Sequence, residues 1–281
     1  MSWPGYIAEA VSRALAEDLG GRGDITSQAT IAEDRHARVE IRSRAAGVLA
    51  GAAAANESFA QIDAAIRIDW QAEDGDPVAA NAVVAEIHGP ARSILTAERT
   101  ALNFLGRLSG IASLTRAYVD AVSGTATCIT HTRKTTPGLR ALELAAVRSG
   151  GGVAHRFGLD DGILIKDNHV ALCGGVAAAI QRAQVQAGHM TRVAVEIDRL
   201  DQLQAAIAAG ADSVLLDNFS LIDLTRAVEQ ADGVLVLEAS GSVTLDTVHA
   251  IAETGVDVIS VGAITHSAPN FDFGLDAVES Q

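Results

Sequence analysis

Residues 193–217 read VAVEIDRLDQLQAAIAAGADSVLLD, a stretch in which two short apolar runs flank a helical segment. The runs 193–197 and 213–216 predict strands, and 199–209 predicts the helix that joins them. Strands joined by helical crossovers run parallel. The stretch therefore predicts part of a parallel sheet with right-handed connections.

The same alternation continues on both sides of this stretch, from residue 124 to residue 261. Further strands are expected at 126–130, 162–165, 234–237 and 256–261, and further helices at 138–149, 170–187, 220–231 and 243–253. Six such units fit a complete or nearly complete barrel, and they also fit an open doubly wound sheet.

The ends of the six apolar runs decide between these two architectures. Each run is followed by polar or small residues, at 131–134, 166–169, 196–198, 217–218, 238–241 and 260–263. A barrel gathers all its carboxyl strand ends at one mouth, where active sites form. An open sheet gathers only the ends beside its switch point. We therefore expect a barrel.

The first hundred residues follow a different pattern. Helices are expected at 5–19 and around 51–61, and alternating strands at 37–42, 65–70 and 83–87, the last stopped by Gly89-Pro90. These elements predict a small antiparallel sheet with helices, an α+β unit. A long helix is expected over 95–122, with Leu95, Leu102 and Leu105 on one stripe and with Gly106 and Gly110 either admitting a neighbour or breaking it. We place the domain boundary in or near this helix.

Composition limits the classes of function. The 281 residues are 48 % hydrophobic and carry a formal net charge of −14, which argues against general nucleic-acid binding. The longest uncharged runs contain polar residues and are too short to span a bilayer, so no membrane partner is expected. The two cysteines, Cys128 and Cys173, predict reduced thiols and a cytoplasmic protein.

The segment 130–169 is basic although the chain is acidic, and it holds the only two lysines, Lys134 and Lys166. Arginine forks bind carboxylates and phosphates through two parallel hydrogen bonds, and a lysine offers a compact point charge. At a barrel mouth, the cationic side chains would form one positive pocket, made of Arg133, Lys134, His155, Arg156 and Lys166.

Two further groups of residues indicate what else the mouth binds. Glu196 and Asp217 follow the middle strands, and Mg²⁺ is usually held by one or two carboxylates together with substrate phosphates. The small residues around Ser240-Gly241 and Gly262 let backbone N–H groups face a phosphate. A polyanionic substrate is therefore expected. The three histidines of the segment lack the spacing typical of zinc sites.

Several motifs, in this order and spacing, resemble those of the quinolinate phosphoribosyltransferase family. They are EDLGGRGDITS (17–27), TAERTALNFLGRLSGIAS (96–113), TRKTTPGLR (132–140), GGGVAHRFGL (150–159), LIKDNH (164–169), LLDN (215–218), EASG (238–241) and VGAITHS (261–267). The resemblance covers nearly the whole chain. It implies an N-terminal α+β sandwich, residues 1–110 joined by the tail 270–281, followed by an incomplete parallel α/β barrel, residues 111–269.

The resemblance also implies a reaction and its residues. Quinolinate and phosphoribosyl pyrophosphate would give nicotinate mononucleotide, CO₂ and pyrophosphate, in a homodimer or a hexamer of dimers whose subunits share active sites. Lys134, Lys166, Glu196 and Asp217 would be catalytic, with Mg²⁺ on the two acids. The implied substrate-binding residues are Arg99 from a partner subunit, Thr132, Arg133, Lys134, His155, Arg156, Lys166, Glu196, Asp217, Ser240, Gly241, Gly262 and His266.

Three positions depart from the family pattern. His131 stands where an acidic residue is common, Ala154 where asparagine is common, and Ser242 where glycine or asparagine is usual. None of them removes a charged group expected to bind substrate. Because of His131, the family pattern does not predict the hydrogen bond made behind the pocket at this position, nor the affinity for one substrate.

Other readings of the same residues stay open. A related phosphoribosyltransferase acting on another aromatic acid would keep the barrel and the phosphate site. A Schiff-base aldolase would use Lys166 at the end of its apolar strand. A non-catalytic protein would bind phosphorylated metabolites without turnover.

Overall fold

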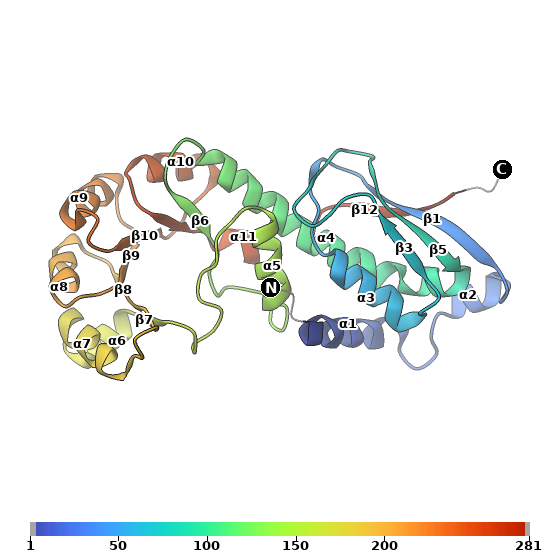
Figure 1. Cartoon of the computed structure of the whole chain (residues 1–281), viewed down its shortest axis with the longest axis horizontal. Helices are drawn as coiled ribbons and strands as arrows, with labels where there is room; N and C mark the ends of the chain where they lie inside the picture. Colours follow the sequence, from blue (N-terminus) through green and yellow to red (C-terminus); the bar gives the residue numbers. More distant parts are fainter. Residues whose placement is uncertain (1–3, 279–281) are drawn as a thin grey trace. The chain divides into compact units, whose positions relative to one another are not determined.

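The computed structural model describes residues 4–278, which form two compact units (Figure 1). Unit 1 contains the described residues up to Arg116, residues Thr135–Gly151 and those from Ile264 onward. Unit 2 contains Ala117–Lys134 and Gly152–Ala263. None of the described helices combines the length and the hydropathy that a membrane-spanning segment requires.

Unit 1 is built on a four-stranded antiparallel sheet, as expected for an α+β unit. Its order is β12 (Phe273–Ala277), β1 (His36–Ser43), β5 (Val83–Pro90) and β3 (Arg67–Trp70). A short pair, β2 (Gly47–Val48) and β4 (Pro77–Val78), lies outside this sheet. The helices of the unit are α1 (Pro4–Leu19), α2 (Ile25–Thr30), α3 (Ala52–Ile62), the first part of α4 (Ala91–Ala121) and α5 (Arg140–Ser149).

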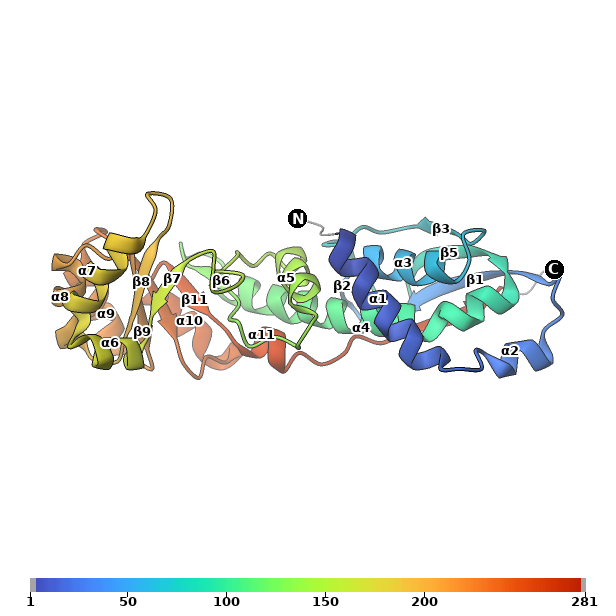
Figure 2. The ribbon, with the colours of Figure 1, turned by 90° about the horizontal axis from the view of Figure 1, so that it is seen from below.

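One face of this sheet is covered by helices, and that side holds the core of the unit (Figure 2). Along β1, Val39 and Ile41 are buried while the residues between them are more exposed, because successive side chains of a strand point to opposite faces. They pack in one cluster with Phe59 of α3 and with Ile94 and Leu105 of α4. The returning strand β12 adds Phe273 to the same cluster, so the end of the described chain completes the N-terminal fold.

The long helix α4 is continuous through Gly106 and Gly110. At Gly110 an added Cβ would lie 2.1 Å from the carbonyl oxygen of Pro269, so the glycine admits the returning chain. The expected leucine stripe is partly wrong. Leu102 and Leu105 are buried, but Leu95 is 40 % exposed and Ile94 takes the core position.

The helix α5, which follows the first strand of the barrel in sequence, belongs to unit 1 by its contacts. Its Glu143 is fully buried and pairs with Arg107 of α4 at 2.8 Å. The same carboxylate accepts hydrogen bonds from the backbone N–H and the hydroxyl of Thr136. A buried carboxylate with this many donors ties the segment after Thr135 to unit 1. The domain boundary expected at residue 110 stays a prediction.

Unit 2 contains a six-stranded parallel sheet in the order β6, β11, β10, β9, β8, β7. Its strands are β6 (Cys128–Thr130), β7 (Ile163–Ile165), β8 (Val193–Ile197), β9 (Ser213–Asp217), β10 (Val236–Ser240) and β11 (Val258–Ser260). Within the described residues β6 and β7 end the sheet and do not pair with each other. The expected incomplete parallel α/β barrel is therefore confirmed.

The connections of unit 2 are α6 (Asp167–Cys173), α7 (Val176–Gln186), the 3₁₀ turn Leu200–Gln202 with α8 (Leu203–Ala208), α9 (Leu221–Ala231) and α10 (Leu245–Glu253). The short helix α11 (Ala263–His266) follows β11, and its residues from Ile264 onward belong to unit 1. The single helix expected at 170–187 is wrong, because Gly174 and Gly175 have φ of 85° and 130° and separate two helices. The fifth strand lies two residues later than expected, which places Glu238 and Ser240 inside it. In unit 1, the strand expected to stop before Gly89 is β5, which continues to Pro90 and there pairs with His36 of β1.

Candidate functional site

The register of the parallel strands gathers the acidic side chains on one face of the unit 2 sheet. Glu196 and Glu238 are both aligned with Leu215, and Ser240 is aligned with Asp217. Partners in register share a face, and residues two apart along a strand share it too. The acids are partly buried on this face. The alternating positions of these strands, such as Val195 and Leu237, are buried on the other face.

Lys166 stands directly after β7, beside the strand that carries Glu196. Its ammonium Nζ lies 2.6 Å from Oε2 of Glu196, with the lysine side chain 47 % exposed and the glutamate side chain 16 % exposed. The backbone N–H of Lys166 donates to Nδ1 of His169 in the first turn of α6. The strand end therefore presents a fixed cation against a carboxylate.

Arg156 and Arg133 form the basic part of the site. Burial lowers the pKa of Arg156, and the positive charge of Arg133 lowers it further, against the opposing charge of Asp161. The guanidinium Nη1 of Arg156 donates to the carbonyl of Gly162 at 3.1 Å, and its Nε is buried with no hydrogen-bond partner among the described residues. Two neighbouring guanidinium groups favour an anionic ligand.

His155 lies between this basic segment and the acidic strands. Its Nε2 is 3.4 Å from Oε2 of Glu238, and its Nδ1 accepts a hydrogen bond from the backbone N–H of Arg156 at 2.8 Å. The other carboxylate oxygen of Glu238 is buried without a partner among the described residues. Sequence reasoning did not assign Glu238 a role. The signal was its membership of the EASG motif, which we read only for its serine and glycine.

The loop 157–161 holds the segment that follows Arg156. The carboxylate of Asp161 accepts hydrogen bonds from the backbone N–H groups of Phe157 at 2.6 Å and Gly158 at 2.9 Å. Burial acts to raise the pKa of Asp161, but these N–H groups and the Arg156 charge outweigh it, so the pKa lies below its ordinary value. The ionised carboxylate of Asp161 therefore fixes the conformation of this loop, next to Arg156.

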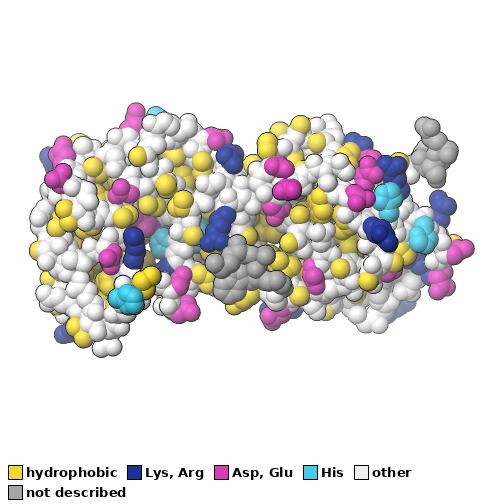
Figure 3. Space-filling model, in the orientation of Figure 1, with side chains coloured by type: hydrophobic (Ala, Val, Ile, Leu, Met, Phe, Trp, Pro, Cys, Tyr) yellow, Lys and Arg dark blue, Asp and Glu magenta, His cyan; other side chains and the backbone are white. Residues whose placement is uncertain are grey.

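The end of β6 brings the remaining basic residues. The hydroxyl of Thr132 accepts a hydrogen bond from the backbone N–H of Lys134 at 3.1 Å, forming a tight turn that leaves Lys134 exposed. His131, one residue earlier, is 1 % exposed and takes no direct part in the charged surface. Figure 3 shows basic, acidic and histidine side chains close together in the middle of the face that unit 2 presents there.

Ser240 is the last residue of β10 and Gly241 follows it, where the expected phosphate-binding residues begin. Gly241 has φ of 104°, and a Cβ built on it would lie 2.2 Å from the side-chain oxygen of Asn218. Only glycine fits such a close approach in this backbone conformation. Gly262 follows β11 in the same unit, so the structure brings these three residues to the carboxyl ends of adjacent strands.

Two expected site residues belong to unit 1. Arg99 lies on α4 and its side chain is exposed, next to Glu98, whose pKa is raised by burial and lowered less strongly by the Arg99 charge. His266 ends α11, and its Nδ1 is 2.6 Å from the hydroxyl of Ser267. The other expected site residues lie in unit 2.

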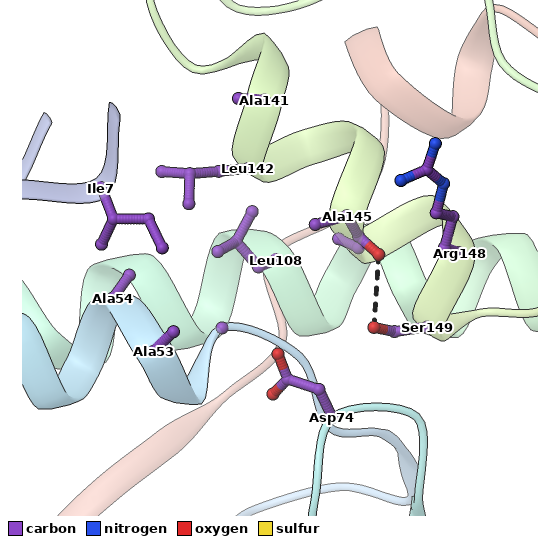
Figure 4. A pocket seen from close by; sticks show the side chains of 12 residues that line it. Ile7, Ala53, Ala54, Asp74, Leu108, Ala141, Leu142, Ala145, Arg148 and Ser149 are labelled. Atoms are coloured by element: carbon purple, nitrogen blue, oxygen red, sulfur yellow. Dashed lines mark hydrogen bonds between the residues drawn. The ribbon is translucent and has the colours of Figure 1, made fainter. Parts of the chain in front are cut away.

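A cavity of unit 1 offers a contrast. It has a volume of about 280 Å³ and is lined mainly by apolar side chains, among them Ile7, Leu108 and Leu142, with Asp74 at its edge (Figure 4). Arg148 is the one basic side chain in this lining. The lining therefore lacks the several cations that a polyanionic substrate requires.

Known proteins resemble this chain over nearly its whole length. The chain matches the family models described as quinolinate phosphoribosyl transferase, N-terminal domain, over residues 24–109 and C-terminal domain over residues 111–276. It is 44 % identical over 274 residues to the probable nicotinate-nucleotide pyrophosphorylase (carboxylating) of Bacillus subtilis, covering 98 % of this chain and 94 % of that protein.

Further relatives show the same full-length likeness. The nicotinate-nucleotide pyrophosphorylase (carboxylating) of Mycobacterium leprae is 43 % identical over 275 residues, which are 95 % of this chain and 96 % of that one. The solved structure of the nicotinate-nucleotide pyrophosphorylase from Francisella tularensis superimposes with a TM-score of 0.95 at 44 % identity, covering 99 % of this chain and 98 % of that chain.

Proposed function

This chain belongs to the quinolinate phosphoribosyltransferase family, and we propose that it transfers the phosphoribosyl group of phosphoribosyl pyrophosphate to quinolinate with loss of CO₂. The products are nicotinate mononucleotide, CO₂ and pyrophosphate. One observation carries the proposal beyond the likeness. Arg133 and Arg156, which favour an anion, lie in the same unit as Lys166 and a sheet face bearing Glu196 and Asp217.

The basic groups would bind and orient quinolinate. Arg133, His155 and Arg156 hold its carboxylates, and Lys166 lies beside the carboxylate that leaves. Nε of Arg156, which is buried and has no partner among the described residues, supports this role, because a carboxylate would satisfy it. Thr132 fixes the turn that presents Lys134, and Lys134 contacts the ribose and the pyrophosphate.

The reaction then proceeds in two steps. The pyridine nitrogen bonds to C1 of the ribose while the C1–O bond breaks and pyrophosphate leaves with its electron pair. The ring becomes cationic, so it accepts the electrons of the C–C bond that breaks as CO₂ departs, and the ring carbon takes a proton. Fixed cations such as Lys134 stabilise the departing pyrophosphate without reorganising.

Mg²⁺ would be held by Glu196 and Asp217, which share a sheet face on neighbouring strands. Among the described residues no three or more His, Cys, Asp or Glu side chains gather as a metal site. Two carboxylates are nevertheless what Mg²⁺ commonly takes from a protein, with substrate phosphates and water completing its shell. The ion would supply neutralisation of the pyrophosphate charge.

The phosphate end would be bound at the last two strands. Ser240 ends β10, Gly241 and Gly262 follow β10 and β11, and the close approach at Gly241 keeps that turn free of side-chain bulk. Late loops of α/β barrels are a frequent phosphate site. His266 would contribute to the 5′-phosphate and pyrophosphate from α11.

Arg99 would act in the active site of a second subunit, in a homodimer or a hexamer of dimers. It is exposed on α4, and Leu95, one turn earlier on the same helix, is an exposed large hydrophobic residue. An isologous contact would bury both and give each subunit the other's arginine. The free thiols Cys128 and Cys173 support a reducing, cytoplasmic location.

The direct test supplies quinolinate, phosphoribosyl pyrophosphate and Mg²⁺ and follows nicotinate mononucleotide by absorbance and CO₂ by release of label from the carboxylate. We expect both products in equal amounts, and no product when quinolinate is replaced by nicotinate. Consumption of another aromatic acid with quinolinate left untouched would overturn the proposal.

The same preparation tests the aldolase reading. A Schiff base needs Lys166 as a neutral amine, whereas its Nζ pairs with the Glu196 carboxylate. Borohydride in the presence of a carbonyl substrate should therefore leave the mass of the protein unchanged. A covalent adduct on Lys166 would favour the aldolase instead.

A further inference from the structure

His131 is buried, and both nitrogens of its ring are used by backbone groups. Its Nδ1 lies 3.2 Å from the carbonyl oxygen of Thr132, and its Nε2 lies 3.1 Å from the backbone nitrogen of His155. A carbonyl oxygen only accepts and a backbone N–H only donates. The ring therefore carries its proton on Nδ1 and accepts at Nε2.

The contact to His155 continues a ladder between two segments of unit 2. The N–H of Val153 donates to the carbonyl of Ile129, and the hydroxyl of Thr130 donates to the carbonyl of Val153. In a parallel ladder the N–H two residues later, that of His155, would reach the carbonyl of residue 131. The imidazole of His131 takes that carbonyl's place.

Resting on the function proposed above, we infer that His131 is a positioning residue for the quinolinate-carboxylate pocket. It holds the backbone nitrogen of His155, the residue directly before Arg156. The next N–H, that of Arg156, is held by Nδ1 of His155, so the two bonds fix both residues in succession. His131 itself touches no substrate.

The inferred role makes a specific demand on the side chain at position 131, namely an acceptor at the distance of Nε2. Glutamine can place its amide oxygen near the position of Nε2, whereas asparagine reaches only as far as Nδ1. Both amide side chains are uncharged and polar, so the two substitutions share any destabilisation that comes from replacing a buried histidine. Only asparagine leaves the partly buried N–H of His155 without an acceptor.

The test compares His131→Gln with His131→Asn in the full-length protein, using steady-state kinetics with each substrate varied in turn. We expect asparagine to raise KM for quinolinate on the order of tenfold, the size of one lost hydrogen bond to a partly buried donor. KM for phosphoribosyl pyrophosphate should stay near wild type, and glutamine should restore KM for quinolinate. His189→Asn, the same change at an exposed position of unit 2, is the control and should change neither constant.

The outcomes separate the two proposals. A wild-type protein without activity on quinolinate overturns the proposed function. An active wild type whose two variants raise KM for quinolinate equally, or raise both KM values together, overturns the positioning role. Should neither variant fold, quinolinate titration of His131→Asp decides. Aspartate supplies a carboxylate acceptor on a shorter side chain, and hydrogen exchange of the backbone N–H of His155 shows whether the hydrogen bond is lost. An unaltered affinity for quinolinate in a variant that has lost this bond would refute the positioning role.

Discussion

Both sheets of this molecule carry charged side chains on one face, but the two units differ in how fully their charged groups are hydrogen-bonded. On the antiparallel sheet of unit 1, Arg38 pairs with Glu86 and Arg44 pairs with Asp276. In unit 2, Glu196 of the parallel sheet pairs with Lys166, but one oxygen of Glu238 on the same sheet and Nε of Arg156, in the loop after His155, are buried without hydrogen-bond partners among the described residues.

The difference separates charges that serve the fold from charges that serve a ligand. Exposed pairs are nearly neutral in their effect on stability, whereas unsatisfied buried polar groups cost free energy and persist where function requires them. Unit 2 also places Arg133 near Arg156, a like-charge arrangement that an anion would relieve. We therefore expect substitutions in unit 2 to change activity and those on the unit 1 sheet to change little.

Among the quinolinate-binding residues of unit 2, the largest effect is expected for Lys166→Ala. Removing a fixed cation from a preorganised site should lower kcat by about 10²- to 10³-fold. Its side chain is 47 % exposed, so the thermal unfolding temperature should stay close to that of wild type. The measurement is turnover at saturating substrates beside a melting curve. Near-normal turnover would make Lys166 a structural residue and would break the contrast between the two sheets.

Arg156→Lys is expected to have the next largest effect. Lysine keeps the charge but loses the planar fork, so quinolinate should bind about 10- to 100-fold more weakly, the loss of one or more charge-assisted hydrogen bonds. The change is read from KM for quinolinate, with KM for phosphoribosyl pyrophosphate as the internal control. An unchanged KM for quinolinate would remove Arg156 from the carboxylate pocket.

Part of the fold and of the candidate site could be predicted from the sequence. Short apolar runs with polar ends predicted the parallel strands and so placed Lys166, Glu196 and Asp217, because strand ends converge whatever the loops do. The break at Gly174-Gly175 was missed because helical periodicity continues across it. Glu238 was missed because its partner, His155, is distant in sequence and only the fold brings the two together.

Arg99 tests whether unit 1 is only structural. Arg99→Ala and Lys134→Ala should each be nearly inactive. If Arg99 serves the partner's site, a mixed dimer of the two variants has one site with both defects and one with neither. Random pairing makes about half of the dimers mixed, so co-expression should restore roughly one quarter of wild-type activity. Activity no higher than that of the parents would confine Arg99 to its own subunit.

The smallest effect is expected for the unit 1 pair Arg38–Glu86, which makes the contrast quantitative. The guanidinium donates to Oε2 of Glu86 at 2.7 and 3.2 Å, yet the arginine side chain is 50 % exposed. Water competes for both partners, and ordering two long side chains costs entropy, so a double-mutant cycle with Arg38→Ala and Glu86→Ala should give a coupling of about 0.2–1 kcal/mol. Unfolding in urea measures this coupling, and turnover should not change in any of the variants. A coupling of several kcal/mol, or a loss of turnover, would contradict the contrast between the two sheets. Hydrogen-bonded pairs of charged side chains on an exposed sheet face could then not be distinguished from charged side chains that serve function.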